Sequence, residues 1–393
     1  MNTPCNRMNS RAFSLGISLL GILSASPSHA QIWVQTSAPL TNWQAIASSA
    51  NGRKLVAVAA TSYPCFCGGP IFTSADSGET WVETDAPLED WRAVASSADG
   101  AKLVAVAAYP GSIYSSTNSG ATWLQTVVSN LDWISVACSA DGSKLVALGS
   151  SFGPIFMSTN SGKTWNPTTA PLSSWRAVAS SADGSRLLAT GYDGVYISVD
   201  SGATWSLLTN APALGRIACS ADGSIFAGAL PISRAFSSVD SGQTWQTVNI
   251  GSSTNWAVTC SADGRLMVAA SDFAINVSTD SGASWTNTSA PFGWWSSIAC
   301  SADGARLAVA GGYNGGIYLS QLTPQPLLHI SLTGGDATVS WIVPSGSYVL
   351  QQNSNSASSN WTDLTNAPSL NLTNLRDQVV FPAIGKSFFR ITQ

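Results

Sequence analysis

Carboxylates are the side chains of this sequence that could carry out acid–base chemistry. The acidic residues that no repeated motif accounts for, and that fall beside the starts of expected strands, are Glu89, Asp90, Asp132, Asp193 and Asp272. Two carboxylates roughly 5 to 9.5 Å apart are what most glycoside hydrolases use. Asp90 and Asp132 stand in consecutive repeats, so such a pair is conceivable. Each of them also directly precedes a Trp at a turn, where Asp is common for local reasons.

Arginines could clamp a carboxylate through paired N–H donors. Arg92 and Arg176 take the same place near the start of an expected strand, and Arg216 lies close to the start of another. Arg216 occupies a different position within its repeat, so we expect it to point to the other side of its strand. Arg92 and Arg176 are therefore the arginines that we predict at a ligand site.

Histidine and cysteine offer little chemistry. His29 and His329 are the only histidines, and both lie outside the repeats, so no His base or His-ligated metal is expected among them. Cysteine and serine share one repeated position, which indicates a small buried residue rather than a metal ligand; it is held by Ser48, Ser96, Cys138, Ser180, Cys219, Cys260 and Cys300. Cys65 and Cys67 lie in the longest expected loop, and their redox state stays open. We predict no metal and no cofactor.

Aromatic residues recur near the starts of the same strands and in loops. The repeated indoles are Trp43, Trp91, Trp133, Trp175 and Trp295, with Trp256 displaced by one residue and Leu214 in place of Trp in one repeat. Tyr109, Tyr192 and Tyr313 fall in loops expected on the same face. One interpretation is a platform on which sugar rings stack or a peptide is gripped. The other is packing between repeats, the more usual role of large aromatics at a repeated position.

Two motifs repeat along the chain and define the elements that must position these residues. Ser-Ala-Asp-Gly begins at Ser97, Ser139, Ser181, Ser220, Ser261 and Ser301, with the variant Ser-Ala-Asn-Gly at Ser49. The pattern S-x-[D/N]-S-G-x-[T/S]-W ends at Trp81, Trp123, Trp165, Trp205, Trp245 and Trp285. Four strand-like segments fill each unit of about 40 residues, which is the measure of a β-propeller blade.

The second motif has a structural explanation that needs no ligand. Its acid or amide can accept backbone N–H bonds within a hairpin turn, the following Gly supplies a positive φ, and the Trp covers the turn. We assign this role to Asp76, Asn118, Asn160, Asp200, Asp240 and Asp280. The segment Ile32-Trp33-Val34 matches the last strand of the other units. We therefore predict an all-β, seven-bladed propeller closed by the N-terminal strand.

Ser238 to Trp245 resembles the Asp-box or BNR repeat of the sialidase-like superfamily, and the resemblance covers roughly residues 31 to 321. Seven units with this layout also resemble the photosystem II stability and assembly factor family. The resemblance implies a propeller fold, and it leaves activity open because these families include enzymes, receptors and assembly factors. Sialidase chemistry would need a Tyr–Glu pair, yet the Glu residues are confined to Glu79, Glu83 and Glu89.

The rest of the chain divides into three further parts. Residues 1–30 form an expected signal peptide, cleaved after Ala30, because Arg7 and Arg11 precede a short apolar run. Residues 31–321 are the propeller, 322–327 a Pro-bearing linker, and 328–393 a small β-sandwich. The sandwich resembles a C-terminal module of secreted bacterial proteins.

Composition narrows the partners. Charged residues make up 10% of the chain and the net charge is -4, so nucleic acid is not an expected ligand. No later segment is apolar over the ~20 residues of a membrane helix. We expect a monomer that is secreted, periplasmic or attached to the cell surface. The function that we predict is non-catalytic binding or scaffolding, with a glycan or polypeptide ligand on the face opposite the Asp boxes. The alternative is a glycoside hydrolase, sialidase-like or another exo-glycosidase, with an unrecognised acid pair.

Overall fold

The structure is a computed structural model. It describes residues 32–60, 68–108, 111–126, 131–150, 152–230, 234–250, 256–321, 328–333, 336–342, 349–354, 360–364, 367–382 and 387–392. Every regular element in these residues is a β-strand, which confirms the all-β prediction. The described chain contains no helix of the length and apolarity that crossing a membrane requires. The expected signal peptide and linker, Tyr109, Cys65 and Cys67 lie outside the described residues.

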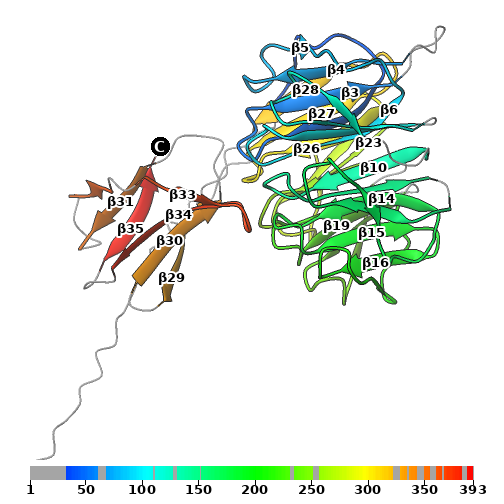
Figure 1. The fold of residues 1–393 in the computed structure, drawn as a ribbon. Helices are drawn as coiled ribbons and strands as arrows, with labels where there is room; N and C mark the ends of the chain where they lie inside the picture. Colours follow the sequence, from blue (N-terminus) through cyan, green and yellow to red (C-terminus); the bar gives the residue numbers. More distant parts are fainter. Residues whose placement is uncertain are drawn as a thin grey trace, which may run out of the picture.

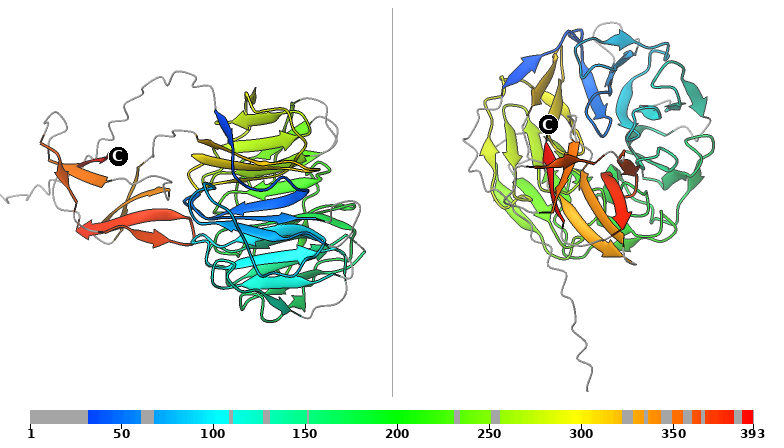
Figure 2. Two further views of the ribbon diagram at one scale, coloured as in Figure 1. Left: turned by 90° about the horizontal axis from the view of Figure 1, so that it is seen from above. Right: turned by 90° about the vertical axis from the view of Figure 1, so that its left-hand side faces the viewer.

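Seven sheets of four antiparallel strands, counted over the described part of 33–321, stand side by side around a ring (Figures 1 and 2). The first three sheets are β2 (Trp43–Ser48), β3 (Leu55–Ala59), β4 (Ile71–Ser74), β5 (Val82–Glu83); β6 (Trp91–Ser96), β7 (Leu103–Ala107), β8 (Ile113–Ser116), β9 (Leu124–Thr126); and β10 (Trp133–Cys138), β11 (Leu145–Gly149), β12 (Ile155–Ser158), β13 (Asn166–Pro167). The next three are β14 (Trp175–Ser180), β15 (Leu187–Gly191), β16 (Gly194–Ser198), β17 (Ser206–Leu207); β18 (Arg216–Cys219), β19 (Phe226–Leu230), β20 (Arg234–Ser238), β21 (Gln246–Asn249); and β22 (Trp256–Cys260), β23 (Met267–Ser271), β24 (Ile275–Ser278), β25 (Thr286–Asn287).

The remaining sheet of the ring joins the two ends of this segment. It contains β26 (Trp295–Cys300), β27 (Arg306–Gly311), β28 (Ile317–Gln321) and β1 (Trp33–Gln35), in the order β1-β28-β27-β26. β1 runs antiparallel to β28, with Trp33 opposite Ser320 and Val34 opposite Leu319. The outermost strand of this sheet is therefore supplied from the N-terminal side.

A circle of backbone hydrogen bonds links the sheets at one end of the ring. The alanine N–H of each Ser-Ala-Asp-Gly turn donates to the alanine carbonyl of the next turn, at 2.7 to 2.8 Å. The circle passes through Ala50, Ala98, Ala140, Ala182, Ala221, Ala262 and Ala302, and Ala302 donates back to Ala50. We call these residues the alanine ring. It satisfies polar backbone groups where the sheets meet.

The second strand of each sheet lies within the core. β3, β7 and β11 are buried at every position, as a continuous apolar run covered on both faces should be. Apolar side chains of neighbouring sheets pack into shared clusters, such as Trp91 of β6 against Val56, Val58 and Ile71 of the preceding sheet.

The repeated tryptophans whose side chains are described belong to this core, so their burial supports packing between repeats and not the ligand platform. Trp43, Trp91 and Trp133 are 0% exposed, and Trp175 and Trp295 are 2% exposed. A register shift follows each of these tryptophans, as between Trp175 and Ala177. This bulge turns the indole toward the preceding sheet while Ala177 packs on the following one. Trp256 needs no bulge because it stands one residue later, and its side chain lies outside the described structure.

The motif that ends in Trp forms the turn between the third and fourth strands. In the first sheet, Asp76 Oδ1 accepts the N–H of Thr80 at 2.9 Å, and Ser74 Oγ accepts the N–H of Gly78 at 2.8 Å. Ser77 as well as Gly78 has positive φ, 64° and 85°, so the turn needs two left-handed residues where the sequence suggested one. The Trp81 indole N–H donates to the Gly78 carbonyl at 3.2 Å. The same bonds recur around Asp200, Asp240 and Asp280.

The C-terminal part contains two further sheets among the described residues. One has the order β29 (His329–Thr333), β30 (Asp336–Ile342), β34 (Arg376–Pro382), β33 (Ser369–Asn371), and the other β32 (Thr362–Asp363), β31 (Val349–Asn353), β35 (Phe388–Thr392). Val339, Trp341 and Val379 of the first sheet pack with Leu350 of the second. Side chains from both sheets therefore share one small core. The strands stand in front of the middle of the ring when viewed from their own side (Figure 2, right).

Candidate binding face

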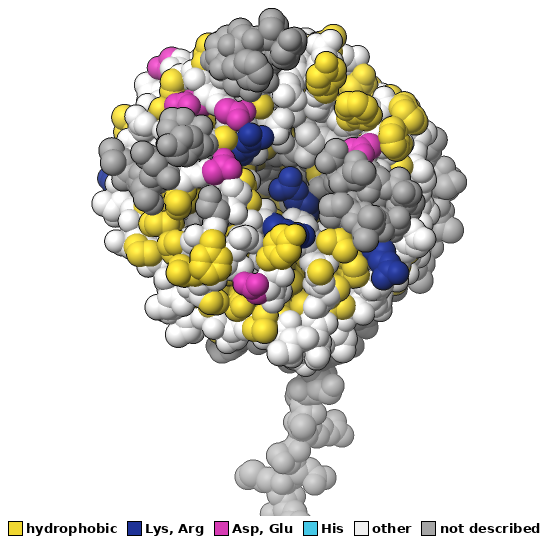
Figure 3. Space-filling view, turned by 90° about the vertical axis from the view of Figure 1, so that its right-hand side faces the viewer, with side chains coloured by type: hydrophobic (Ala, Val, Ile, Leu, Met, Phe, Trp, Pro, Cys, Tyr) yellow, Lys and Arg dark blue, Asp and Glu magenta, His cyan; other side chains and the backbone are white. Residues whose placement is uncertain are grey.

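Two sets of loops lie side by side on the face of the ring away from the alanine ring. One set joins the last strand of a sheet to the first strand of the next, and the other joins second and third strands within a sheet. Isolated bridges pair the two sets, linking Thr41 with Gly315, Gly69 with Glu89 and Gly153 with Ser173. We call this surface the mouth face, and Figure 3 views it with the central hollow in the middle.

Large apolar side chains crowd the mouth face. Trp294 is 57% exposed, Tyr313 75%, Tyr192 77% and Phe292 80%. The exposed large apolar residues that the described loops of this face carry are Leu40, Leu88, Phe152, Leu172, Tyr192, Phe273, Phe292, Trp294 and Tyr313. Apolar side chains are seen spread around the hollow in Figure 3. Exposed apolar surface concentrated on one face marks an interaction site more often than scattered residues do.

Three aromatic contacts give this surface a defined geometry. The rings of Trp294 and Tyr313 lie 6.2 Å apart, and those of Phe273 and Phe292 lie 5.1 Å apart. The Arg176 Cζ atom lies 4.7 Å from the centre of the Tyr192 ring, within the range of a cation–π contact. Tyr192 and Tyr313 are thus exposed where the sequence placed them, and Arg176 is held beside Tyr192.

Trp294 and Phe292 were missed in the sequence. The signal for Trp294 was the doublet Trp294-Trp295, because the repeat accounts for only one indole there and Trp295 is buried. The signal for Phe292 was its position after Ala-Pro, where Leu40, Leu88 and Leu172 stand in other repeats.

Basic side chains border the central hollow (Figure 3). Arg92 and Arg176 are the second residues of β6 and β14, and Arg216 is the first residue of β18. Arg216 lies opposite Ala229 in its sheet, and the equivalent pair in the preceding sheet is Ala177 opposite Thr190. Arg216 is therefore equivalent to Ala177 and not to Arg176. It makes no hydrogen bond or ion pair with any residue that the structure describes. Its side chain reaches solvent, yet the surrounding protein lowers the pKa of the guanidinium by desolvation.

Three of the acids that could have formed a catalytic pair, Glu89, Asp90 and Asp132, are engaged locally. Arg92 Nη2 donates to Asp90 Oδ2 at 2.8 Å, an ion pair within one strand start. Ser150 Oγ donates to Asp132 Oδ2 at 2.6 Å, and the Tyr114 hydroxyl donates to Glu89 Oε1 at 3.3 Å. Burial and the nearby Glu89 carboxylate raise the pKa of Tyr114. The charge of Arg92 is therefore paired with Asp90, two residues before it.

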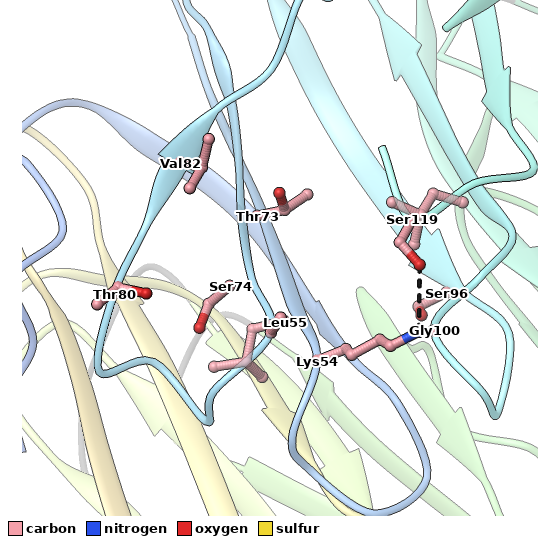
Figure 4. Close-up of a pocket in the computed structure, with 11 residues that line it drawn as sticks. Lys54, Leu55, Thr73, Ser74, Thr80, Val82, Ser96, Gly100 and Ser119 are labelled. Atoms are coloured by element: carbon pink, nitrogen blue, oxygen red, sulfur yellow. Dashed lines mark hydrogen bonds between the residues drawn. The ribbon is translucent and has the colours of Figure 1, made fainter. Parts of the chain in front are cut away.

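A pocket of about 240 Å³ opens elsewhere, between the first and second sheets (Figure 4). Its charged side chain, Lys54, donates from Nζ to Ser119 Oγ at 3.2 Å. The carbon stem of Lys54 packs under Gly100 of the next turn, and the residue is half-buried. The basic residues after these turns are thus packing elements and not a fully solvated rim. We do not place a ligand in this pocket.

The thiols of the described residues lie in the inner strands. Burial raises the pKa of Cys138, Cys219 and Cys300 to about 12 and that of Cys260 well above its usual value. Cys138 Sγ donates to the Ser96 carbonyl at 3.1 Å. Protonated, hydrogen-bonded thiols are poor nucleophiles and poor metal ligands. Over the residues that the structure describes, no three His, Cys, Asp or Glu side chains gather in a way that could hold a metal ion.

Similar solved structures settle the fold. A structure of YCF48 bound to D1 peptide aligns with 79% of this chain and 100% of its own, at 16% identity and a TM-score of 0.58. YCF48 from Cyanidioschyzon merolae aligns with 75% of this chain and 99% of its own, at 17% identity and a TM-score of 0.56. The fold is a β-propeller.

An enzyme shares the same fold. The Niastella koreensis GH74 enzyme aligns with 79% of this chain at 16% identity and a TM-score of 0.56, and this chain spans 59% of that enzyme's length. No protein-family profile matches the sequence. No curated protein matches it either. At these identities the propeller is similar both to a protein solved with a bound peptide and to an enzyme. The fold therefore does not distinguish a binding function from an enzymatic one.

Proposed function

We propose that this propeller is a non-catalytic binding module whose mouth face holds an extended polypeptide. The observation that carries the proposal is the set of exposed apolar side chains around the central hollow, with Trp294, Tyr313 and Phe292 at its most exposed points. Rigid aromatic rings supply contact area while losing little conformational entropy.

The aliphatic members of the set favour a polypeptide over a glycan. Leu40, Leu88 and Leu172 are all more than half exposed and stand between the aromatic residues around the ring. Sugar rings stack on flat aromatic faces, whereas branched leucines suit apolar side chains of a peptide. The Trp294–Tyr313 pair could serve either ligand, so a glycan is kept as an outcome of the experiment.

Arg216 adds a preference for negative charge. Its guanidinium has no described partner and is partly desolvated, which makes pairing with an acidic group favourable. Arg176 already packs on Tyr192 and could contribute a second positive charge. We therefore propose that the bound polypeptide carries an acidic residue flanked by apolar ones.

We propose that the seven sheets are the blades of one closed propeller over residues 31–321, related to Asp-box proteins, and that residues 328–393 form a separate β-sandwich. Supporting this are the alanine ring, the pairing of β1 with β28 and the small shared core of the C-terminal sheets. Export after cleavage at Ala30, with the mature protein secreted, periplasmic or at the cell surface, is proposed on the sequence of residues 1–30. We propose a monomer.

The competing function is glycoside hydrolysis by an acid pair. The engagement of Asp90 by Arg92 and of Asp132 by Ser150 speaks against that pair, because each carboxylate is stabilised as a local acceptor. A glycosidase acid needs a raised pKa, which burial without such partners would produce.

Peptide and glycan arrays probed with the full chain test the proposal, with sialoside and β-glucan hydrolysis assayed in parallel. We expect selected acidic–apolar peptides to bind, with binding lost in Tyr313→Ala and kept in Val82→Ala. Val82 is a matched control because it is exposed on an outer strand, away from the mouth face. Turnover of either substrate, binding of glycans alone, or peptide binding that Tyr313→Ala leaves unchanged would contradict the proposal.

A further inference from the structure

The alanine ring lies at the end of the propeller away from the mouth face, and its methyl groups form an apolar surface there. Ala140, Ala182 and Ala221 are buried and pack together, with Ala98 and Ala262 beside them. Their backbone N–H and carbonyl groups are used in the circle of hydrogen bonds. The alanine residues themselves therefore offer apolar contact through their methyl groups.

A side chain from the C-terminal part covers this surface. Leu375 is half-buried and packs against these five alanines, which we call the alanine cluster, although all of them lie more than 110 residues before it in the sequence. It stands in the turn between β33 and β34, and in two views the end of this hairpin reaches toward the propeller (Figures 1 and 2).

Hydrogen bonds hold the turn that carries Leu375 in one conformation. Asn371 Oδ1 accepts the N–H of Thr373 at 2.9 Å, and Asn374 Oδ1 accepts the N–H of Arg376 at 3.1 Å. Arg376 Nε donates to Ser340 Oγ at 3.1 Å, and Nη2 donates to the Ser340 carbonyl at 3.2 Å, which ties the turn to β30. A fixed turn loses little freedom when its tip makes a contact.

Leu375 also adopts a backbone conformation that leucine rarely takes. Its φ is 53°, in the left-handed region where Gly or Asn is normally found. Residues held in such conformations persist where the surroundings compensate for the strain, and they cluster at functional contacts. Here the packing of the leucine side chain on the alanine cluster compensates for the strain.

We propose that the alanine ring is the docking surface for the C-terminal module of this same chain, and that Leu375 is the side chain that seats it. Docking covers the centre of this end of the ring and holds the module on the side away from the mouth face. A ligand then reaches the propeller from the mouth face while the module stands behind it.

Charge supports the same orientation. Burial lowers the pKa of Arg376, whereas attraction to the Asp263 carboxylate, in the Ser-Ala-Asp-Gly turn that begins at Ser261, raises it. Asp263 accepts from Ser261 Oγ at 2.6 Å and from the N–H of Arg265 at 3.1 Å, so its carboxylate is fixed in place. The turn therefore brings an apolar and a basic group to a surface that offers methyl groups and an acid.

Small-angle X-ray scattering of the full chain tests this docking, with Leu375→Asp as the disrupting variant and Leu372→Asp as the matched control. Leu372 lies in the same turn and is exposed. We expect Leu375→Asp to increase the maximum dimension and to give the profile of two independently moving bodies, while Leu372→Asp retains the wild-type profile.

Leu375→Gly separates docking from folding of the turn. Gly accepts a φ of 53° without strain, so the hairpin itself is not weakened, while the side chain that contacts the alanine cluster is gone. We expect the same change in scattering as for Leu375→Asp. If Leu375→Gly folds and its profile matches that of the wild type, the docking role of Leu375 is wrong.

Discussion

At the scale of single residues, the repeated acid of the Trp-ending motif acts as a local hydrogen-bond acceptor. Hydrogen bonds from Thr80 lower the pKa of Asp76 to about 2, and equivalent bonds lower the pKa of Asp200, Asp240 and Asp280. Asn118 makes the same backbone bond, with its Oδ1 accepting the N–H of Thr122 at 3.0 Å. An amide therefore replaces the carboxylate without loss of the turn.

The thermal stability should consequently fall at acidic pH. Replacing the repeated Asp residues by Asn should make that loss of stability smaller. A carboxyl whose pKa is lowered by folding stabilises the protein above its unfolded pKa of about 3.9, and this contribution is lost as the pH falls toward its folded value. We expect the Tm to drop between about pH 4 and pH 2. The drop should be shallower when Asp76, Asp200, Asp240 and Asp280 are all changed to Asn, and steeper in Asn118→Asp. Thermal unfolding across this pH range measures it, and identical pH profiles for the three proteins would refute the role of these carboxylates.

At the scale of elements, one short strand from the N-terminal side completes the sheet at which the ring closes. β1 covers the edge of β28, and Thr36 continues the pairing by donating to the Ile317 carbonyl at 2.9 Å. Trp33 packs on the cluster of the sixth and seventh sheets. Without β1, the polar edge of β28 would be open to water and to other chains.

Deleting residues 32–38 should lower the free energy of unfolding by about 2 to 4 kcal/mol, because a half-buried Trp and one strand pairing are lost. Val34→Ala is the control, since Val34 is exposed and its loss removes little buried area. Denaturant unfolding measures the change. An unfolding midpoint equal to that of Val34→Ala would show that β1 does not close the ring energetically.

At the scale of the whole molecule, the sequence predicted the sheets better than the surface. Each sheet follows from a repeated apolar run and two repeated turns, which are local signals. Whether the repeated tryptophans face the hollow or the core depends on the bulge that follows Trp175 and its counterparts. This bulge turns them into the core. A bulge is set by contacts between sheets, so the repeat alone left open whether Trp43 and Trp295 line the hollow or pack between the sheets. Trp294 was overlooked because it falls outside the repeat.

The seating of Leu375 was also beyond sequence reasoning. Its contact joins residues far apart in the sequence, and nothing in the turn Asn371 to Arg376 marks a partner. With this end of the ring covered, the mouth face is the exposed apolar surface near the ring's centre. Ligand binding is therefore expected at that face.

The most direct measurement is the affinity of an array-selected peptide for the wild type, Trp294→Ala and Val82→Ala, by isothermal titration calorimetry. Trp294 is exposed, so its replacement should leave the fold intact, which an unchanged Tm would verify. An aromatic anchor removed from an interface costs about 2 kcal/mol, and we therefore expect affinity to weaken by roughly 10-fold or more in Trp294→Ala. Val82→Ala should bind as the wild type does. Equal affinity of all three proteins would contradict a ligand site on the mouth face.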